Sequence, residues 1–182
     1  MKTLYKPIFI ILTLLLFVPA KGIPQKVATK DSLEIKIKAA AREIMTAAKT
    51  CSLITIDEEG RPIVRMMDPF LPENDFTVWL ATNPKSRKAA QIKKNPKVSL
   101  YYVENESAGY VMLQGNAELV NDPKEKVKRW KDEWQAFYPN TKEDYLLIKV
   151  TPLWMEVVSY NHNLVGDPNT WEAPKIVFQK EK

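Results

Sequence analysis

A serine followed by two cations, Ser86-Arg87-Lys88, stands where the sequence predicts the start of a short helix. A helix start favours anions, because its first backbone N–H groups are unpaired and its dipole is positive there. Two cations at this end make sense if a dianion neutralises them. Arginine contacts a phosphate through two N–H groups, and lysine adds a point charge. The residue types therefore predict a phosphate site, and a solvated basic helix face is the alternative.

Two prolines limit the helix that carries these residues. Asn83-Pro84 ends a strand expected over residues 76–81, because proline has no amide hydrogen for the sheet and restricts the residue before it. Ser86 is a good N-cap. Asn95-Pro96 stops the helix before a strand over residues 98–103. The expected order is strand, tight turn, short helix, turn and strand.

The remaining reactive side chains are few. The chain has one cysteine, Cys51, and one histidine, His162. They exclude an internal disulfide and make a Cys-based or multi-His metal centre implausible. We expect Cys51 to be a small buried residue, because a catalytic thiol would need a histidine partner that is not evident. We expect His162 to be a surface or hydrogen-bonded loop residue.

Composition predicts a folded domain without affinity for nucleic acid. Hydrophobic residues make up 45% of the 182 residues, and five are tryptophans, which suits a packed core. The 27 basic and 22 acidic side chains give a formal charge of +5. Without Lys2 and Lys6 of the leader the charge is about +3, by subtraction of two. That charge is too mild and too evenly mixed with acids for nucleic-acid binding.

The N-terminus reads as a targeting segment. Lys2 and Lys6 precede an apolar run from Ile8 to Val18, and Val18-Pro19-Ala20 suits a signal peptidase. We therefore expect a signal peptide over residues 1–20 and an exported protein, with an uncleaved membrane anchor as the alternative. Residues 21–30 are expected to be a linker, and residues 31–182 a single domain.

Two amphipathic helices are expected beside the strands. Asp31 should cap the first, which presents one apolar face at helical spacing. Asn121 or Asp122 should cap the second, with Pro123 at its first position. The first face comprises Leu33, Ile37, Ala40, Ala41, Ile44, Ala47 and Ala48, and the second comprises Val127, Trp130, Trp134, Phe137 and Tyr138.

The other segments read as short strands joined by turns. Gly115, inside one of them, suggests a bulge or a close backbone approach. The fold class is therefore mainly β with peripheral helices (α+β), arranged as a β-barrel. The expected strands cover residues 51–56, 62–67, 76–81, 98–103, 110–120, 145–150 and 153–159, and a short strand covers 176–178 at the tail.

Three segments in this order resemble the pyridoxamine 5'-phosphate oxidase-like superfamily, the FMN-binding split β-barrels, and within it the general stress protein branch. They are Gly60-Arg61-Pro62-Ile63-Val64-Arg65-Met66-Met67; the run from Ala81 to Ile92 with Asn95-Pro96-Lys97-Val98-Ser99-Leu100; and the strand from Tyr110 to Glu118.

The resemblance implies a homodimer with FMN at the subunit interface. It implies that Arg65, Ser86, Arg87 and Lys88 hold the FMN phosphate. The backbone of Arg65, Met66 and Met67 would run beside the isoalloxazine and ribityl groups, and Ala81 and Thr82 would lie near the ring. Tyr110 or Gln114 could reach the ring from a neighbouring strand.

Two departures bear on activity. The oxidase proper has a further basic residue a few positions beyond the equivalent of Arg65, where this chain has Asp68-Pro69-Phe70-Leu71-Pro72. It also has a C-terminal Arg and His for its substrate, whereas no arginine follows Arg129 here and His162 lacks that setting. These differences argue against true pyridoxamine-phosphate oxidase activity.

The functional hypotheses differ in what the flavin does. The leading one is an FMN-dependent oxidoreductase of unknown substrate, in which the cofactor carries hydride or electrons. The second is a non-catalytic flavin carrier or stress-linked binding protein. An interaction module without flavin and a heme or deazaflavin binder are the other readings.

Overall fold

The computed structural model describes residues 30–104 and 109–178. The expected signal peptide, and all but the last residue of the linker, lie outside the described residues. The described elements are α1 (Lys30–Ala47), β1 (Cys51–Ile56), β2 (Pro62–Met67), β3 (Val78–Thr82), α2 (Arg87–Lys94), β4 (Lys97–Val103), β5 (Tyr110–Val120), α3 (Pro123–Lys128), the 3-10 turn η1 (Asp132–Trp134), β6 (Leu146–Val158) and β7 (Lys175–Val177).

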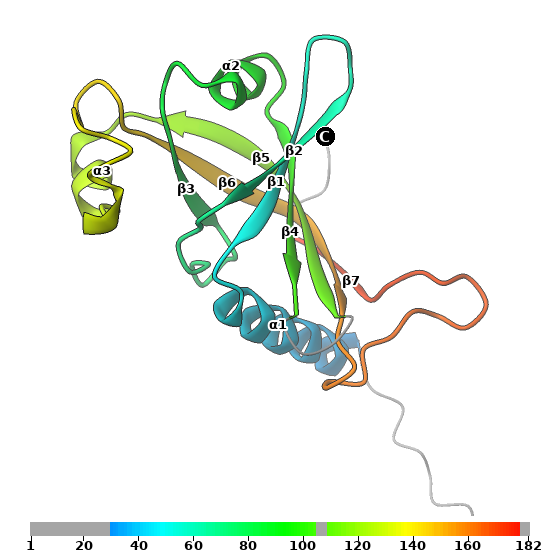
Figure 1. The fold of residues 1–182 in the computed structure, drawn as a ribbon. Coiled ribbons are helices and arrows are strands. Elements are labelled where there is room, and N and C mark those ends of the chain that lie inside the picture. The colour runs from blue at the N-terminus through cyan, green and yellow to red at the C-terminus, as the bar shows by residue number, and fades with distance from the viewer. Residues whose placement is uncertain (1–29, 105–108, 179–182) are drawn as a thin grey trace, which may run out of the picture.

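The strands form one antiparallel sheet in the order β2-β1-β4-β5-β6-β3, with β7 added to β6. The sheet curls into a split barrel that does not close (Figure 1). A single bridge between Pro69 and Leu80 links the segment after β2 to β3. The expected class, mainly β with peripheral helices, is confirmed.

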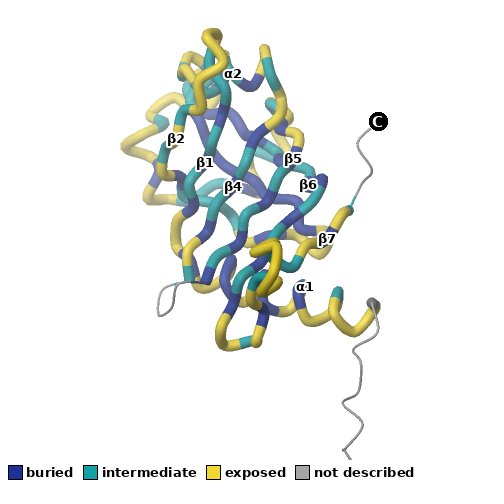
Figure 2. The backbone as a smooth tube through the Cα atoms, turned by 90° about the vertical axis from the view of Figure 1, so that its right-hand side faces the viewer, coloured by how far each residue is buried: buried dark blue, intermediate teal, exposed yellow. Residues whose placement is uncertain are grey.

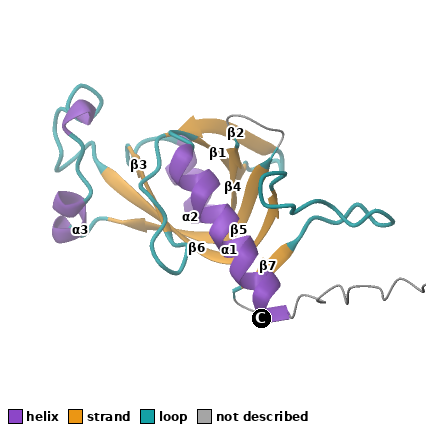
Figure 3. Cartoon of the chain, turned by 90° about the horizontal axis from the view of Figure 1, so that it is seen from below, coloured by secondary structure: helices purple, strands orange, loops and turns teal. Residues whose placement is uncertain are grey.

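The core lies between the concave side of the sheet and α1, which crosses one end of the barrel (Figures 2 and 3). The buried α1 residues recur at helical spacing, as the sequence predicts. Two expected members are wrong, because Leu33 is 42% exposed and Ala47 is also exposed, while Met45 is buried instead. The helix begins at Lys30, so that Asp31 lies in its first turn rather than at the cap.

The barrel strands largely match the predicted ranges, with two main exceptions. β3 begins at Val78 because Phe76 has a φ of 66°, which a strand does not accommodate. Residues 146–158 form one continuous strand, whereas two strands were expected around Thr151-Pro152. The register shift between Gln114 and Gly115 absorbs the irregularity at Pro152 and confirms the predicted bulge.

The second helix is shorter than expected. Asp122 caps α3 by accepting from Glu125 N at 2.9 Å, and the helix ends at Lys128. The predicted apolar face is therefore split: Trp134 is buried, whereas Val127 is 80% and Phe137 is 74% exposed. A second hydrophobic cluster forms here, away from the main core, and comprises Trp79, Ala81, Trp134, Tyr145 and Leu147 with Phe70, Val120, Trp130 and Tyr138 packed against it.

Candidate functional site

The N-terminus of α2 has the local structure that the sequence predicts. Ser86 is the N-cap, and its hydroxyl accepts from Ala89 N at 3.3 Å. The same oxygen lies 2.8 Å from the Thr82 hydroxyl, at the end of β3. Asn95 closes the helix at its other end by donating its N–H to the Gln91 carbonyl. The two hydroxyls thus join β3 to the first turn of α2.

Arg65 reaches α2 from the neighbouring strand β2. In the β1–β2 register it faces Leu53, so its side chain lies on the same face of the sheet as the buried Leu53 and Thr55. Its guanidinium donates to Thr55 Oγ1 at 2.7 Å and to Gln91 Oε1 at 3.0 Å. The Thr55 hydroxyl also donates to Gln91 Oε1 at 2.6 Å. This triangle of hydrogen bonds holds Arg65 against α2.

Arg65, Arg87 and Lys88 gather positive charge at this end of α2. Burial, and then repulsion from Arg87, lowers the pKa of Arg65. Burial, and then repulsion from Arg65, lowers the pKa of Lys88. Within residues 30–104 and 109–178, none of the three cations forms an ion pair. Such a group of cations has the chemistry to attract an anion, and we call these three residues with Ser86 the basic cradle.

Other residues implied by the resemblance lie on different sides of the sheet. Met66 is 67% exposed on the outer face, opposite Ser52 of β1, whereas Met67 is buried. Ala81 and Thr82 are buried at the end of β3, directly before the loop that leads to Ser86. Thr82 alone among these four has a side-chain contact with a cradle residue, within the described part of the chain.

Tyr110 and Gln114 lie on the outer face, not on the face that carries Arg65. Gln114 Nε2 donates to Ser99 Oγ at 2.6 Å across the β4–β5 ladder. Tyr110 stacks on Tyr101 with ring centroids 5.3 Å apart. Burial, and then Glu156, raises the pKa of Tyr110.

Two residues of the site were missed by sequence reasoning. Thr55 is a fully buried hydroxyl on an otherwise apolar strand face, and this position was a usable signal. Gln91 lies three and four residues beyond Lys88 and Arg87, so it shares their side of α2. Both are neutral acceptors, and a search for charged residues passes over them.

The segment that replaces the oxidase's extra basic residue has another role in this fold. Asp68 accepts from Lys131 Nζ at 2.6 Å and from Trp134 Nε1 at 2.9 Å. It therefore ties the end of β2 to the connection between α3 and β6. No cation of this segment joins the cradle, as the sequence indicated.

Arg129, the last arginine of the sequence, and His162 both make structural contacts. Arg129 is buried, with its guanidinium 3.7 Å from the Trp79 ring centroid and in ion pairs with Glu73 and Glu125. His162 Nε2 lies 2.8 Å from Glu43 Oε2, which confirms the expected hydrogen-bonded loop residue. Cys51 is buried, as expected, and burial raises its pKa to about 12.

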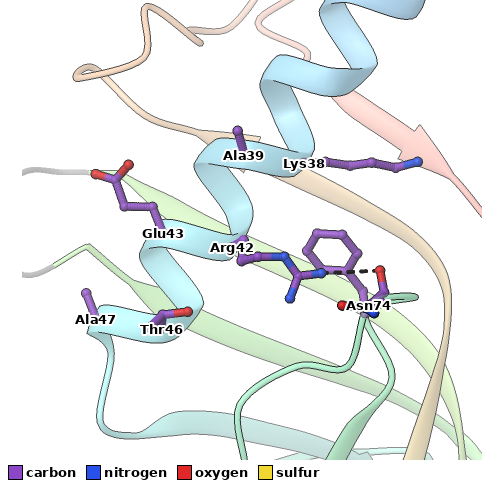
Figure 4. A pocket seen from close by; sticks show the side chains of 8 residues that line it. Lys38, Ala39, Arg42, Glu43, Thr46, Ala47 and Asn74 are labelled. Carbon is purple, nitrogen blue, oxygen red and sulfur yellow. Dashed lines mark hydrogen bonds between the residues drawn. The ribbon is translucent and has the colours of Figure 1, made fainter.

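A pocket of about 640 Å³ lies beside α1, distant in sequence from the cradle (Figure 4). The Arg42 side chain donates to the carbonyls of Pro72, Glu73 and Asn74 at 3.1–3.2 Å and covers the Phe76 ring at 4.6 Å. These bonds hold the loop before β3, so Arg42 has a structural role that needs no ligand. The pocket is therefore a structural junction.

The fold is an open split barrel, and it carries a group of three cations at the start of α2. The family profile of pyridoxamine 5'-phosphate oxidase matches residues 37–159. The chain therefore belongs to the pyridoxamine 5'-phosphate oxidase family. No protein of curated function matches the sequence.

Several solved structures are similar to this chain. General stress protein 26 from Bacillus anthracis is 25% identical with a TM-score of 0.58, over 69% of this chain and 93% of its own. A protein related to general stress protein 26 from Clostridium acetobutylicum is 26% identical with a TM-score of 0.61, over 70% and 90%. An FMN binding protein from Nostoc punctiforme, 14% identical with a TM-score of 0.54 over 81% and 95%, shares the fold.

Proposed function

We propose that this protein binds FMN through the phosphate at the basic cradle. The observation that carries the proposal is the group of three cations that form no ion pair with any residue that the structure describes, at a helix start capped by Ser86. A phosphate dianion would relieve the repulsion between Arg65 and its neighbours. Membership of an oxidase family, and the likeness to a protein described as FMN binding, support the choice of this anion.

In this proposal, different residues contact different parts of FMN. Arg65, oriented by Thr55 and Gln91, offers N–H donors to the phosphate, and Arg87 and Lys88 add charge. The first backbone amides of α2 face the same region. Ala81 and Thr82 would border the ring, and the backbone of Met66 and Met67 would follow the ribityl chain. When bound, the flavin would supply hydride or electron transfer.

The phosphate assignment is tested by comparing FMN with riboflavin, which lacks the phosphate. We expect isothermal titration to give FMN a tenfold or larger advantage, since a charge-assisted contact contributes about 1.5–3 kcal/mol. Arg65→Met should remove most of that advantage. Arg61→Met is the matched control, because Arg61 pairs with Asp57 and Glu59 in the exposed hairpin turn. Equal affinities for the two flavins would refute the assignment.

Two roles for the bound flavin are distinguishable by turnover. An oxidoreductase should oxidise a reduced nicotinamide with an electron acceptor at a steady rate. A carrier should retain flavin without turnover. The missing C-terminal Arg and His pair favours the carrier, because no arginine follows Arg129 in the sequence and His162 contacts Glu43 instead. An absorption spectrum of the purified protein also separates flavin from heme or deazaflavin.

A homodimer is part of the proposal, since an interfacial cofactor needs two copies. Val64 is 62% and Met66 is 67% exposed on one face of the edge strand β2. Exposed apolar side chains on an edge strand suit burial against another chain.

Export through the N-terminal segment is likewise a proposal, with membrane anchoring as the alternative. In the part of the chain that the structure describes, no helix is long and apolar enough to cross a membrane. The apolar run from Ile8 to Val18 lies outside that part. Mass spectrometry of the protein from its native host distinguishes a mature N-terminus at Lys21 from an intact leader.

A further inference from the structure

A pocket of about 660 Å³ lies between α3 and the loop that leads to β6. Figure 1 shows α3 and this loop standing out at one side of the barrel, apart from α2. The volume is within the range of small-molecule sites, about 300–1,000 Å³. The lining residues are Asn121, Pro123, Lys126, Val127, Trp130, Gln135, Thr141, Lys142 and Tyr145.

The walls of the pocket are aromatic and aliphatic. Trp130 and Tyr145 meet edge to face, with ring centroids 5.3 Å apart and planes at 80°. Val127 is 80% exposed, although Val120 and Trp130, which flank α3, pack against the second hydrophobic cluster. Pro123 adds a further apolar surface from the start of α3. A flat apolar ligand would cover this surface and stack on the aromatic walls.

The charged groups of the lining are both cations. Lys126 Nζ lies 5.7 Å from the Tyr145 ring centroid and donates to Asn121 Oδ1 at 3.1 Å and to the Lys142 carbonyl at 3.4 Å. Burial lowers the pKa of Lys126. Lys142 stands on the facing loop. The lining therefore complements a negative group next to the aromatic walls.

Three acids near the lining in sequence have partners outside the pocket. Asp122 caps α3 through Glu125 N, and Glu125 pairs with the buried Arg129. Asp144 accepts from the backbone N–H of Asn140 at 3.3 Å. The lining has no carboxylate of its own.

We propose that this pocket binds a small aromatic carboxylate, with its ring against Trp130 and Tyr145 and its carboxylate at Lys126. The site goes beyond the proposed flavin function and does not rest on it, because none of the lining residues belongs to the basic cradle. Two neutral amides also line the pocket: Asn121, whose Oδ1 accepts from Lys126, and Gln135, whose Nε2 donates to the Pro139 carbonyl at 3.5 Å.

The probe is phenylacetate, and phenylacetamide is its uncharged counterpart. NMR of the full folded domain follows backbone amide shifts up to about 20 mM, because ligands this small bind in the millimolar range. We expect saturable shifts within residues 121–145 for phenylacetate and at least about fivefold weaker binding of the amide. No saturation, shifts confined to α2, or equal binding of acid and amide would overturn the proposal.

Two lysines on the same helix give a matched pair of variants. Lys126→Met should weaken phenylacetate about tenfold, since it removes the charged contact and keeps the aliphatic stem. Lys128→Met should leave the affinity unchanged, because Lys128 is exposed and does not line the pocket. Equal affinities of the two variants would contradict the site. Arg65→Met should retain phenylacetate binding, which separates this pocket from the cradle whether or not FMN binds.

Discussion

At the scale of single residues, the cradle depends on neutral side chains as much as on charges. The sequence is sufficient to predict Ser86 as a cap and Arg87 and Lys88 beside it, because local spacing fixes a helix start. It does not indicate how Arg65 is held. That depends on the β1–β2 register, which brings Thr55 under the guanidinium, and on the packing of α2, which brings Gln91 to it.

Thr55→Val tests this positioning role. Valine keeps the shape of the side chain but cannot accept from Arg65 or donate to Gln91. We expect FMN affinity to fall about five- to tenfold while riboflavin affinity is unchanged, because only the phosphate contact is disturbed. Calorimetry measures both ligands. Thr46→Val, on an exposed position of α1, is the control. An equal loss for both flavins would assign Thr55 a purely structural role.

The buried thiol of Cys51 gives a pH dependence of stability. Burial raises the pKa of Cys51 from 9.0 to about 12. An unfolded chain releases this proton near pH 9 and the folded chain does not, so the stabilisation is present below pH 9 and is lost as the pH rises towards 12. We expect the unfolding free energy in urea to fall more steeply between about pH 8 and 10.5 for the wild type than for Cys51→Ala, because this range spans the pKa of the unfolded thiol. Parallel curves would contradict the assignment.

At the scale of elements, prediction succeeds where the signal is local and fails where distant segments decide. Prolines and capping residues determine where α2 begins and ends, and alternating side-chain burial identifies the strands β1 and β2. The strand through Pro152 is continuous because β6 holds one extra residue, Leu153, opposite Gln114 and Gly115 of β5, and no local pattern reveals that pairing. The helical spacing from Val127 to Tyr138 also misleads, since Trp134 packs through η1 rather than through a longer α3.

Gly115→Ala tests the close approach at the bulge. A Cβ there would lie 2.6 Å from the Thr151 carbonyl oxygen and 2.8 Å from Val150 Cγ1. The backbone of β6 must shift, so we expect unfolding free energy to fall by about 2–3 kcal/mol in urea titrations. Gly60→Ala is the comparison. Gly60 has a φ of +79° but no neighbour within 4 Å, so the loss should be only about 1 kcal/mol. An equal or smaller loss at Gly115 would refute the steric account.

At the scale of the whole molecule, the exposed edge strand β2 would connect the proposed FMN site with the proposed dimer interface. Arg65 turns inward to α2, while its neighbours Val64 and Met66 face outward on β2. One short strand therefore carries part of the cradle on one face and an apolar surface on the other. The sequence shows the alternation, but only the sheet order shows that β2 is an edge strand.

Val64→Asp is expected to separate the protein into monomers. A charge placed in a buried apolar interface is costly without a partner, and Val64 is not one of the cradle residues. Analytical ultracentrifugation should give twice the chain mass for the wild type and the single mass for the variant. FMN affinity should fall with assembly, because a cofactor at the interface needs both copies. Val177→Asp, at a 58% exposed position of β7, should leave both the mass and the affinity unchanged. A wild-type monomer that binds FMN tightly would show that the site is complete within one chain.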